Sequence, residues 1–216
     1  MASRSASAAS SSPTCADSRP LAPIAGRDTG VLVVTGPSGV GKGTLISDLL
    51  EERPDLRLSV SATTRRPREG EVDGRDYHFL TPEEFERRER AGEFLESATY
   101  AGNRYGTLIS ELDAPARAVV LEIELQGARQ VRERLPEAVR VFIAPPSVEA
   151  LRERLEGRGS DTAEQIASRL EVAERELEAK REFQYVIVND DRQEAAQELG
   201  NLVATIWGPR PGASEG

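Results

Sequence analysis

The residues best suited to chemistry begin with a glycine-rich segment that reads Gly-Pro-Ser-Gly-Val-Gly-Lys-Gly-Thr. Glycines let the backbone approach a polyphosphate with its amide N–H groups pointing inward, and the start of a following helix adds partial positive charge. Lys42 supplies a full charge for the β- and γ-phosphates, and a hydroxyl after it can hold Mg²⁺. Gly43 stands where that hydroxyl is usual, so Thr44 is the nearest candidate metal ligand. The segment predicts a phosphate-binding loop for a nucleoside triphosphate, and its residues are Gly36, Pro37, Ser38, Gly39, Val40, Gly41, Lys42, Gly43 and Thr44.

A second segment combines positive charge with a phenol. Arg65, Arg66, Arg68 and Arg75 lie within eleven residues, and Tyr77 follows them. Arginine binds phosphate oxygens through paired N–H bonds, and a tyrosine hydroxyl adds a neutral donor. In a chain of net charge −9, this local positive charge favours one specific anion. A solvated basic loop is the alternative for the segment taken alone.

The composition of the 216 residues excludes several classes of protein. No apolar run approaches the ~18 residues that span a bilayer. The acidic net charge argues against nucleic-acid and membrane-surface partners. A single cysteine, Cys15, excludes a disulfide framework and fits a reducing, cytoplasmic setting, and a single histidine, His78, excludes His-paired metal sites. The composition leaves the oligomeric state open.

Apolar runs rich in β-branched residues mark the elements that must position these groups. They cover residues 31–35, 119–123, 139–144 and 185–188, and an alternating run covers 56–62. Such runs predict strands buried on both faces, as in a parallel sheet. Helical patterns separate them at residues 42–52, 126–135, 148–155, 162–181 and 193–206. The alternation predicts an α/β fold with a helix-covered parallel sheet.

Residues 63–115 interrupt this alternation. They contain short strand candidates at 77–80 and 93–100 and a helix that begins at Thr81 and ends near Gly92. The helix start, Thr-Pro-Glu-Glu, is a capping box with proline in the first helical position. We interpret the stretch as a small inserted mixed α/β domain. The predicted division is a disordered leader (1–28), core (29–62), inserted domain (63–106), core (107–150), helical lid (151–180), core (181–208) and flexible tail (209–216).

Further motifs follow the arginine-rich segment in a fixed order. They are Glu96, Tyr105-Gly-Thr107, Leu121-Glu-Ile-Glu-Leu-Gln-Gly127, Leu155-Glu-Gly-Arg-Gly159 and Val186-Ile-Val-Asn-Asp-Asp191. With the phosphate loop and residues 61–77, they resemble guanylate kinase over residues 30–207 without a break. The resemblance implies a P-loop NTPase-type core sheet with an inserted monophosphate-binding domain and a helical lid. It also implies transfer of the γ-phosphoryl of Mg-ATP to GMP or dGMP, giving ADP and GDP, in purine nucleotide metabolism.

The resemblance also implies roles for individual residues. Arg65, Arg68, Tyr77 and Tyr105 would hold the phosphate of GMP, and Ser61, Glu96, Thr107 and Glu124 would read its base. The chemistry of Glu96 agrees, because guanine presents two adjacent N–H donors to a carboxylate, whereas adenine presents an acceptor in place of one of them. Glu124 stands where the family usually has aspartate.

Three arginines, Arg154, Arg158 and Arg169, lie around a predicted helix–loop–helix lid. Of these, the resemblance makes Arg158 and Arg169 catalytic together with Lys42, with Arg158 also touching ATP. Positioned positive charge supplies most of the rate in phosphoryl transfer. Asn189, just past the last strand, is a further candidate for contact with ATP. Glu122 is either an acid beside Mg²⁺ or a structural acid bonded to nearby backbone.

Two other interpretations compete with a GMP kinase. A non-catalytic guanylate-kinase-like binding module typically lacks the loop lysine, whereas this chain has Lys42. A P-loop phosphotransferase with a different acceptor is hinted at by the Gly43-Thr44 ending, and Glu96 with the arginine set speaks against it.

Overall fold

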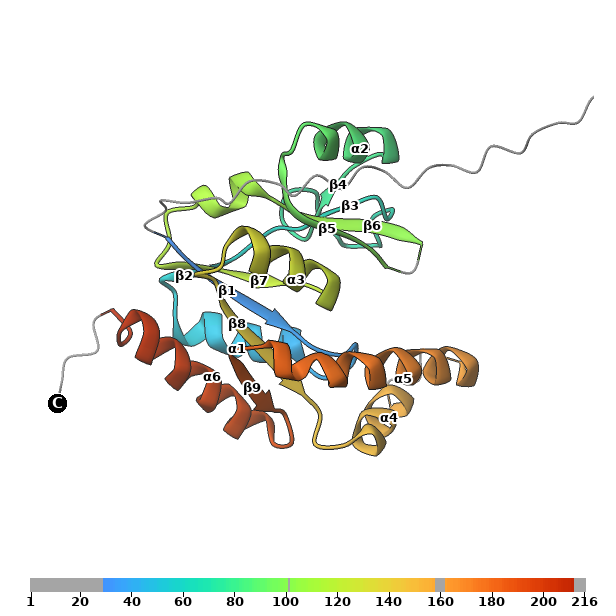
Figure 1. The fold of residues 1–216 in the computed structure, drawn as a ribbon, viewed down its shortest axis with the longest axis vertical. Coiled ribbons are helices and arrows are strands. Elements are labelled where there is room, and N and C mark those ends of the chain that lie inside the picture. Colours follow the sequence, from blue (N-terminus) through green and yellow to red (C-terminus); the bar gives the residue numbers. More distant parts are fainter. Residues whose placement is uncertain (1–28, 101, 158–161, 212–216) are drawn as a thin grey trace, which may run out of the picture.

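The computed structural model describes residues 29–100, 102–157 and 162–211 as a larger parallel sheet, a smaller sheet and flanking helices (Figure 1). The predicted leader and residues 212–216 of the predicted tail lie outside the described residues, as do residues 101 and 158–161.

The core sheet has five strands within the described residues, and every pairing in it is parallel. In spatial order the strands are β2 (Leu56–Leu58), β7 (Ala118–Glu122), β1 (Gly30–Thr35), β8 (Val139–Ala144) and β9 (Tyr185–Val188). The central strand β1 is buried from Val31 to Thr35. The prediction of a parallel sheet is confirmed, and burial on both faces holds for the inner strands β1, β7 and β8. It is wrong for the edge strands, since three of the four residues of β9 and two of the three residues of β2 are exposed.

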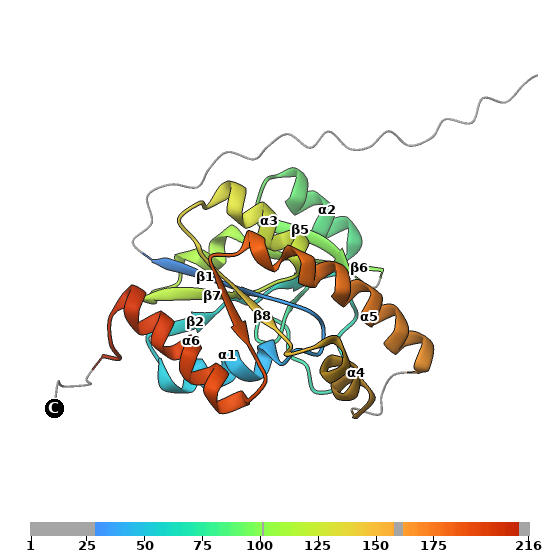
Figure 2. The same cartoon turned by 60° about the horizontal axis from the view of Figure 1, so that its bottom comes forward.

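Helices cover both faces of this sheet. The helices outside the smaller sheet's part of the chain are α1 (Lys42–Glu52), α3 (Leu125–Arg134), α4 (Val148–Gly157), α5 (Ala163–Glu178) and α6 (Arg192–Trp207), with short 3₁₀ helices η1 (Ile109–Asp113) and η2 (Ala179–Glu182). Of these, α4 and α5 bury their apolar residues against each other. Leu32 and Val34 pack with α1 and α6, whereas Val31 and Val33 pack with α3 on the opposite face. Figure 2 shows α1 and α6 on one side of the sheet and α3 on the other. The alternating direction of side chains along β1 thus serves two separate hydrophobic clusters.

The smaller sheet is formed by the predicted insertion together with Ala62, the residue before it. In spatial order its strands are β4 (His78–Phe79), β3 (Ala62–Thr63), β6 (Asn103–Leu108) and β5 (Phe94–Tyr100), with α2 (Pro82–Arg90) beside them. Thr81 caps α2 as predicted, since its hydroxyl accepts a bond from Glu84 N at 3.2 Å. The second half of the predicted capping box is not formed, because the Glu84 carboxylate accepts from Arg87 and Arg88 instead. Phe85 of α2 stacks on Phe94 of β5 with ring centroids 4.3 Å apart.

One strand prediction is wrong at its carboxyl end. Residues 56–62 were expected to form a single strand, but β2 ends at Leu58 and Ala62 belongs to β3 of the smaller sheet. The break follows from a side chain, because Val60 N donates to Glu111 Oε2 at 2.9 Å instead of to a neighbouring strand. The chain therefore leaves the core sheet between Ser59 and Ser61.

Candidate nucleotide site

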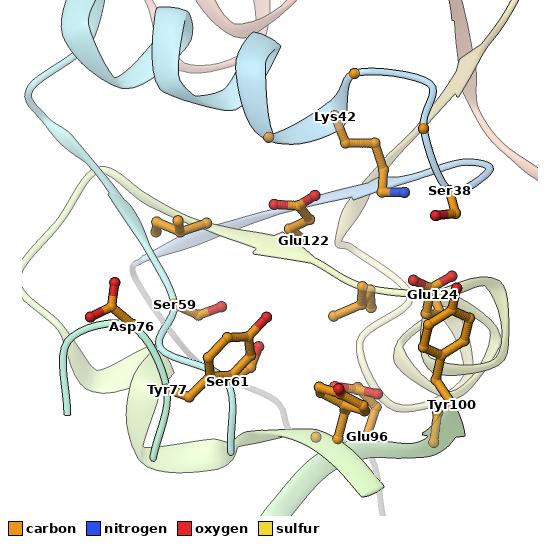
Figure 3. A pocket seen from close by; sticks show the side chains of 18 of the residues that line it. Ser38, Lys42, Ser59, Ser61, Asp76, Tyr77, Glu96, Tyr100, Glu122 and Glu124 are labelled. Atoms are coloured by element: carbon orange, nitrogen blue, oxygen red, sulfur yellow. The ribbon is translucent and has the colours of Figure 1, made fainter. Parts of the chain in front are cut away.

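A cavity of about 480 Å³ opens between the phosphate loop, the carboxyl end of β7 and the smaller sheet. Figure 3 shows Lys42 and Ser38 on one side, Tyr77 and Glu96 on the opposite side and Glu122 between them. The structure thus brings together groups from the two segments that carry the predicted chemistry. The predicted site residues that line the cavity are Ser38, Gly39, Gly41, Lys42, Gly43, Thr44, Ser61, Tyr77, Glu96, Tyr105, Glu122 and Glu124.

The phosphate loop connects the end of β1 to the first residue of α1. Gly36 (φ 145°) and Gly41 (φ 99°) have backbone angles that side-chain-bearing residues rarely adopt. A Cβ on Gly36 would lie 3.1 Å from the carbonyl carbon of Ile143, and one on Gly41 would lie 2.6 Å from Asn189 Nδ2. Glycine is therefore required at both positions for the loop to lie this close to its neighbours.

Lys42 points back over the loop that precedes it. Its Nζ donates to Gly36 O at 2.6 Å and to Pro37 O at 3.3 Å, and the residue is only 8% exposed. The nearby carboxylate of Glu122 has its pKa raised by loss of solvent, an effect that the Lys42 ammonium opposes. The ammonium is thus held beside the phosphate loop, where phosphate oxygens could replace the two carbonyl oxygens as its hydrogen-bond acceptors.

Asn189 supports the loop from behind. It is 7% exposed, and its Nδ2 donates to Val40 O at 2.7 Å. Gly36, Pro37 and Val40 likewise shape the loop without lining the cavity. The predicted contact between Asn189 and ATP stays a prediction, beside this observed structural role.

Thr44 and Glu122 form an oxygen-bearing corner of the cavity. A Cβ on Gly43 would lie 3.7 Å from Glu122 Oε2, so the carboxylate lies directly beside the first turn of α1. No cluster of three or more His, Cys, Asp or Glu side chains suited to a metal occurs among the described residues. Mg²⁺ needs no such cluster, since one or two protein oxygens plus substrate phosphates and waters complete its coordination. The donor set at this corner therefore fits Mg²⁺.

Arg65 is fixed by a neighbouring carboxylate and by aromatic rings. Its two terminal nitrogens donate to the two oxygens of Glu71 at 3.0 and 2.8 Å, and its guanidinium lies 5.2 Å from the Tyr77 ring centroid. Glu71 also accepts from Arg68 N at 2.7 Å, and these bonds lower the pKa of its carboxyl group. The guanidinium does not line the cavity, whereas Tyr77 and Tyr105 do, with ring centroids 6.1 Å apart.

Glu96 is the most deeply buried acid of the cavity wall. It is 4% exposed, and its Oε1 accepts a bond of 2.8 Å from the hydroxyl of Thr107, which is itself fully buried. Burial raises the pKa of Glu96 to about 7, and the charge of Glu124 acts in the same direction. Glu124 is the residue before α3 and makes no side-chain cap bond to that helix. Two carboxyl groups thus face a cavity in which hydrogen-bond donors from a ligand would stabilise their ionised forms.

The cavity also has polar residues that sequence reasoning missed. Ser59, Asp76 and Tyr100 line it (Figure 3), and the buried Ser59 hydroxyl has no hydrogen-bond partner among the described residues. Tyr100 lies four residues after Glu96 on β5, so the alternation of side chains along a strand places both on one face. That spacing was the signal available for Tyr100, whereas nothing in the sequence distinguishes Ser59.

The predicted lid is formed by α4 and α5. Leu151 and Leu155 of α4 pack with Ile166, Leu170 and Ala173 of α5. Arg158 lies outside the described residues, and Arg169 on α5 is half-buried and does not line the cavity.

One packing contact and one electrostatic interaction link this lid to the cavity region. A Cβ on Gly39 would lie 2.7 Å from Leu155 Cδ2, so α4 packs directly on the phosphate loop. Glu176 of α5 was not predicted as a site residue, yet burial and the charge of Glu124 raise its pKa to about 7.

The guanylate kinase family profile matches residues 28–205. The chain belongs to the guanylate kinase family. A guanylate kinase of Synechocystis sp. is 54% identical over 176 residues, which cover 80% of this chain and 92% of the relative. A guanylate kinase of Rubrobacter xylanophilus is 50% identical over 179 residues, which cover 82% of this chain and 94% of the relative.

A solved structure agrees with the sequence relatives. The crystal structure of guanylate kinase from Anaplasma phagocytophilum matches with a TM-score of 0.67 and 34% identity, over 84% of this chain and 88% of that one. The predicted family and fold class are confirmed. Of the helices in the described residues, none is both long and apolar enough to cross a bilayer.

Proposed function

We propose that this chain transfers the γ-phosphoryl of Mg-ATP to GMP, giving ADP and GDP, within the cavity between the phosphate loop and the smaller sheet. One observation carries the assignment: the loop with Lys42 and the buried carboxylate of Glu96 face each other across a single cavity (Figure 3). A kinase of this kind needs its two nucleotides arranged with their phosphates together and their bases apart. The chain is accordingly a nucleoside monophosphate kinase and a transferase of purine nucleotide metabolism.

ATP binds at the phosphate loop. The inward amides of residues 36–44 hold its β- and γ-phosphates, and Lys42 exchanges its bonds to Gly36 O and Pro37 O for bonds to phosphate oxygens. Thr44 and Glu122 would hold Mg²⁺, directly or through its waters. When bound, Mg²⁺ neutralises charge that develops on the transferred group.

The phosphate of GMP binds between the phenols of Tyr77 and Tyr105 and the guanidinium groups of Arg65 and Arg68. Arg65 is already oriented by Glu71 and by the Tyr77 ring, so little ordering remains for the ligand to supply. No general base is needed, because the accepting phosphate oxygens of GMP are already anionic at neutral pH.

Glu96 reads the guanine base. Its ionised carboxylate accepts the ring N–H and the exocyclic amino N–H of guanine, while the Thr107 hydroxyl holds Oε1 at 2.8 Å. Adenine would set an acceptor against this carboxylate, and an unpaired buried acceptor costs on the order of 1–3 kcal/mol. Ser61 and Glu124, both lining the cavity, complete the base site, in which dGMP is accepted as well because these contacts do not involve the 2′-hydroxyl.

The lid supplies the remaining charge. We assign Arg158 and Arg169 to the transferred phosphoryl group once both nucleotides are bound, and Arg158 also to ATP. Assembly of these arginines only in the closed complex would prevent loss of the phosphoryl group to water.

We propose for the chain the functional division that its sequence predicts. Residues 29–62, 107–150 and 181–208 form the core, residues 63–106 the GMP-binding domain and residues 151–180 the lid. Both substrates are nucleotides of the cytoplasm, and we place the enzyme there.

A release assay for ADP with each of the four common nucleoside monophosphates, in the presence of Mg-ATP, tests the proposal. We expect rapid turnover with GMP and dGMP and little with AMP or UMP. Equal rates with AMP and GMP would contradict the guanine assignment and leave only an ATP-dependent phosphotransferase.

A further inference from the structure

Strand β5 contains an irregularity directly before Glu96. Phe94 pairs with Leu108 and Glu96 pairs with Thr107, so Leu95 is an extra residue on this strand. A bulge of this kind changes the direction of the side chains around it and is frequent beside active sites. Phe94 packs against α2, whereas Leu95 is fully buried in the core cluster that includes Ala128 and Val131 of α3. The bulge thus turns the strand from one hydrophobic cluster to the other at the residue before Glu96.

Arg134, the last residue of α3, satisfies the carbonyl groups of this bulge. Its Nη1 donates to Phe94 O and also to Leu95 O, the latter at 2.7 Å. The residue is only 7% exposed, and burial lowers the pKa of its guanidinium. A buried cation is costly unless its hydrogen bonds are made, so this one is tied to the two carbonyls it contacts.

Gln130 holds the other side of Glu96. Its Oε1 accepts from Ser97 N at 3.1 Å, and its Nε2 donates to Ser97 O at 2.6 Å. The side-chain amide thereby takes the place of a neighbouring strand for this one residue. The backbone is therefore fixed by α3 both before and after Glu96.

Gly127 leaves room for the Glu96 carboxylate itself. A Cβ on Gly127 would overlap Glu96 Oε2 and lie 2.9 Å from its Cδ, closer than real Cβ contacts. Gly127, Gln130 and Arg134 are spaced by three and four residues, so they share one face of α3. Figure 1 shows α3 between the core sheet and β5.

We propose that the α3 face formed by Gly127, Gln130 and Arg134 positions the Glu96 carboxylate and thereby sets the selection of guanine, an inference that rests on the base-reading role proposed above. The three are positioning residues: they contact β5 and Glu96, and they act on the base through that carboxylate. Loss of the Arg134 bonds leaves two buried carbonyls unpaired, and the bulge relaxes toward a regular strand that turns Glu96 away from the cavity.

Gly127→Ala tests the inference with a single methyl group. The methyl displaces the Glu96 carboxylate, so we expect the KM for GMP to rise ~10-fold to 100-fold, since small misplacements in a site cost this much. The preference for GMP over AMP falls with it, while the KM for ATP stays within about twofold, as expected when only one subsite changes. The higher helix propensity of alanine offsets part of the cost of displacing the buried carboxylate, and thermal unfolding checks that the variant keeps its fold.

Gly200→Ala is the matched control. Gly200 lies in α6, away from the cavity, and its Cβ would meet only the flexible end of Glu52 at 3.4 Å. This variant keeps wild-type KM values for both nucleotides. Wild-type values for GMP in Gly127→Ala as well, or an equal rise in the KM values for GMP and ATP, would overturn the proposal.

Arg134→Met and Arg134→Lys give an independent test. The methionine variant loses GMP preference, and the lysine variant regains most of it, because an ammonium can donate to the same two carbonyls. A folded methionine variant with unchanged GMP preference would overturn the proposal. If that variant does not fold, the kinetics of Gly127→Ala are the test of the proposal. Failure of the proposed function is distinguishable, since it would appear as a wild-type enzyme without preference for GMP.

Discussion

The carboxylate of Glu71 holds the guanidinium of Arg65 in a two-point ion pair, with nitrogen–oxygen distances of 2.8 and 3.0 Å. The same carboxylate accepts from Arg68 N, so one acid organises both arginines assigned to the phosphate of GMP. We expect Glu71→Gln to raise the KM for GMP ~10-fold, because removing a charge-assisted partner from a site costs on the order of 1–3 kcal/mol. The KM for ATP should not change. Steady-state kinetics with each nucleotide varied in turn measure both.

Glu86→Gln is the control for the loss of an acid from this domain, and it should leave the KM for GMP unchanged. Glu86 pairs with Arg90 on the exposed side of α2 at 2.8 Å, and surface pairs contribute little. A lower KM for GMP in Glu71→Gln would show that the carboxylate competes with phosphate for Arg65 instead of orienting it.

Glu96→Gln should stabilise the protein without ligand at alkaline pH while it weakens guanine selection. The folded chain raises the pKa of Glu96 from 4.5 to about 7. Between these values the folded state holds a proton that the unfolded chain has released, so stability falls as pH rises through this window. Above it, the ionised buried carboxylate costs ~3 kcal/mol, which the neutral amide avoids.

Urea unfolding of Glu96→Gln and wild type at pH 5 and pH 8 measures this difference. The variant should gain stability over wild type at pH 8 and gain little at pH 5. A gain that is equal at both values would mean that packing, and not the charge of Glu96, is responsible.

The affinity for GMP should depend on the ionisation of Glu96. Only the ionised carboxylate accepts both guanine donors, and its pKa of about 7 in the empty cavity makes binding compete with protonation. We expect the KM for GMP to rise ~10-fold between pH 8 and pH 6, as required for one proton released on binding. The GMP phosphate itself titrates near ~6. Glu96→Gln separates the two effects. In this variant the KM for GMP should still change with the ionisation of the phosphate, but it should no longer change near pH 7.

Lys42→Met should abolish phosphoryl transfer with little change in GMP binding. The Nζ donates to Gly36 O and Pro37 O of the phosphate loop, so its loss removes charge from the side of the cavity that we assign to ATP. Calorimetric titration with GMP, beside the ADP-release assay, measures both quantities. Parallel loss of GMP affinity would assign Lys42 to the monophosphate instead.

Two neighbouring glycines of the phosphate loop should respond oppositely to alanine. At Gly43 a Cβ meets only the Glu122 carboxylate at 3.7 Å, so Gly43→Ala should raise the free energy of unfolding by ~0.5–1 kcal/mol through helix propensity. At Gly41, with φ 99° and a Cβ 2.6 Å from Asn189 Nδ2, alanine should cost ~1–3 kcal/mol. Urea unfolding of both variants measures the difference, and equal effects would contradict the loop geometry described above.

The elements with strong local signals could be predicted from the sequence. Continuous apolar runs identified β1, β7, β8 and β9, and the Thr81 capping box identified the start of α2. Strand β6 gave no signal of its own in the pattern of apolar residues, because its residues, which include Arg104, Tyr105 and Gly106, are held by pairing with β5 and β3.

The site was predictable where residues carry their own chemistry. Lys42, Tyr77 and Glu96 belong to recognisable motifs and line the cavity. The contacts of Arg134 and Gln130 were not predictable, since their partners are backbone groups 33 to 40 positions away in sequence. The pattern of side chains in a sequence does not indicate which backbone carbonyl groups a strand bulge leaves available for hydrogen bonds.

The attachment of β5 to α3 has a consequence for the design of new acceptor specificity. Glu96, which we propose reads the base, lies on a strand attached to the core helix α3, whereas Arg65, which we propose binds the phosphate, lies on a separate loop. A library confined to residues around Gly127 and the Leu95 bulge could therefore be screened for kinases of other purines. The phosphate loop and the arginines would keep their wild-type sequence in every member of such a library.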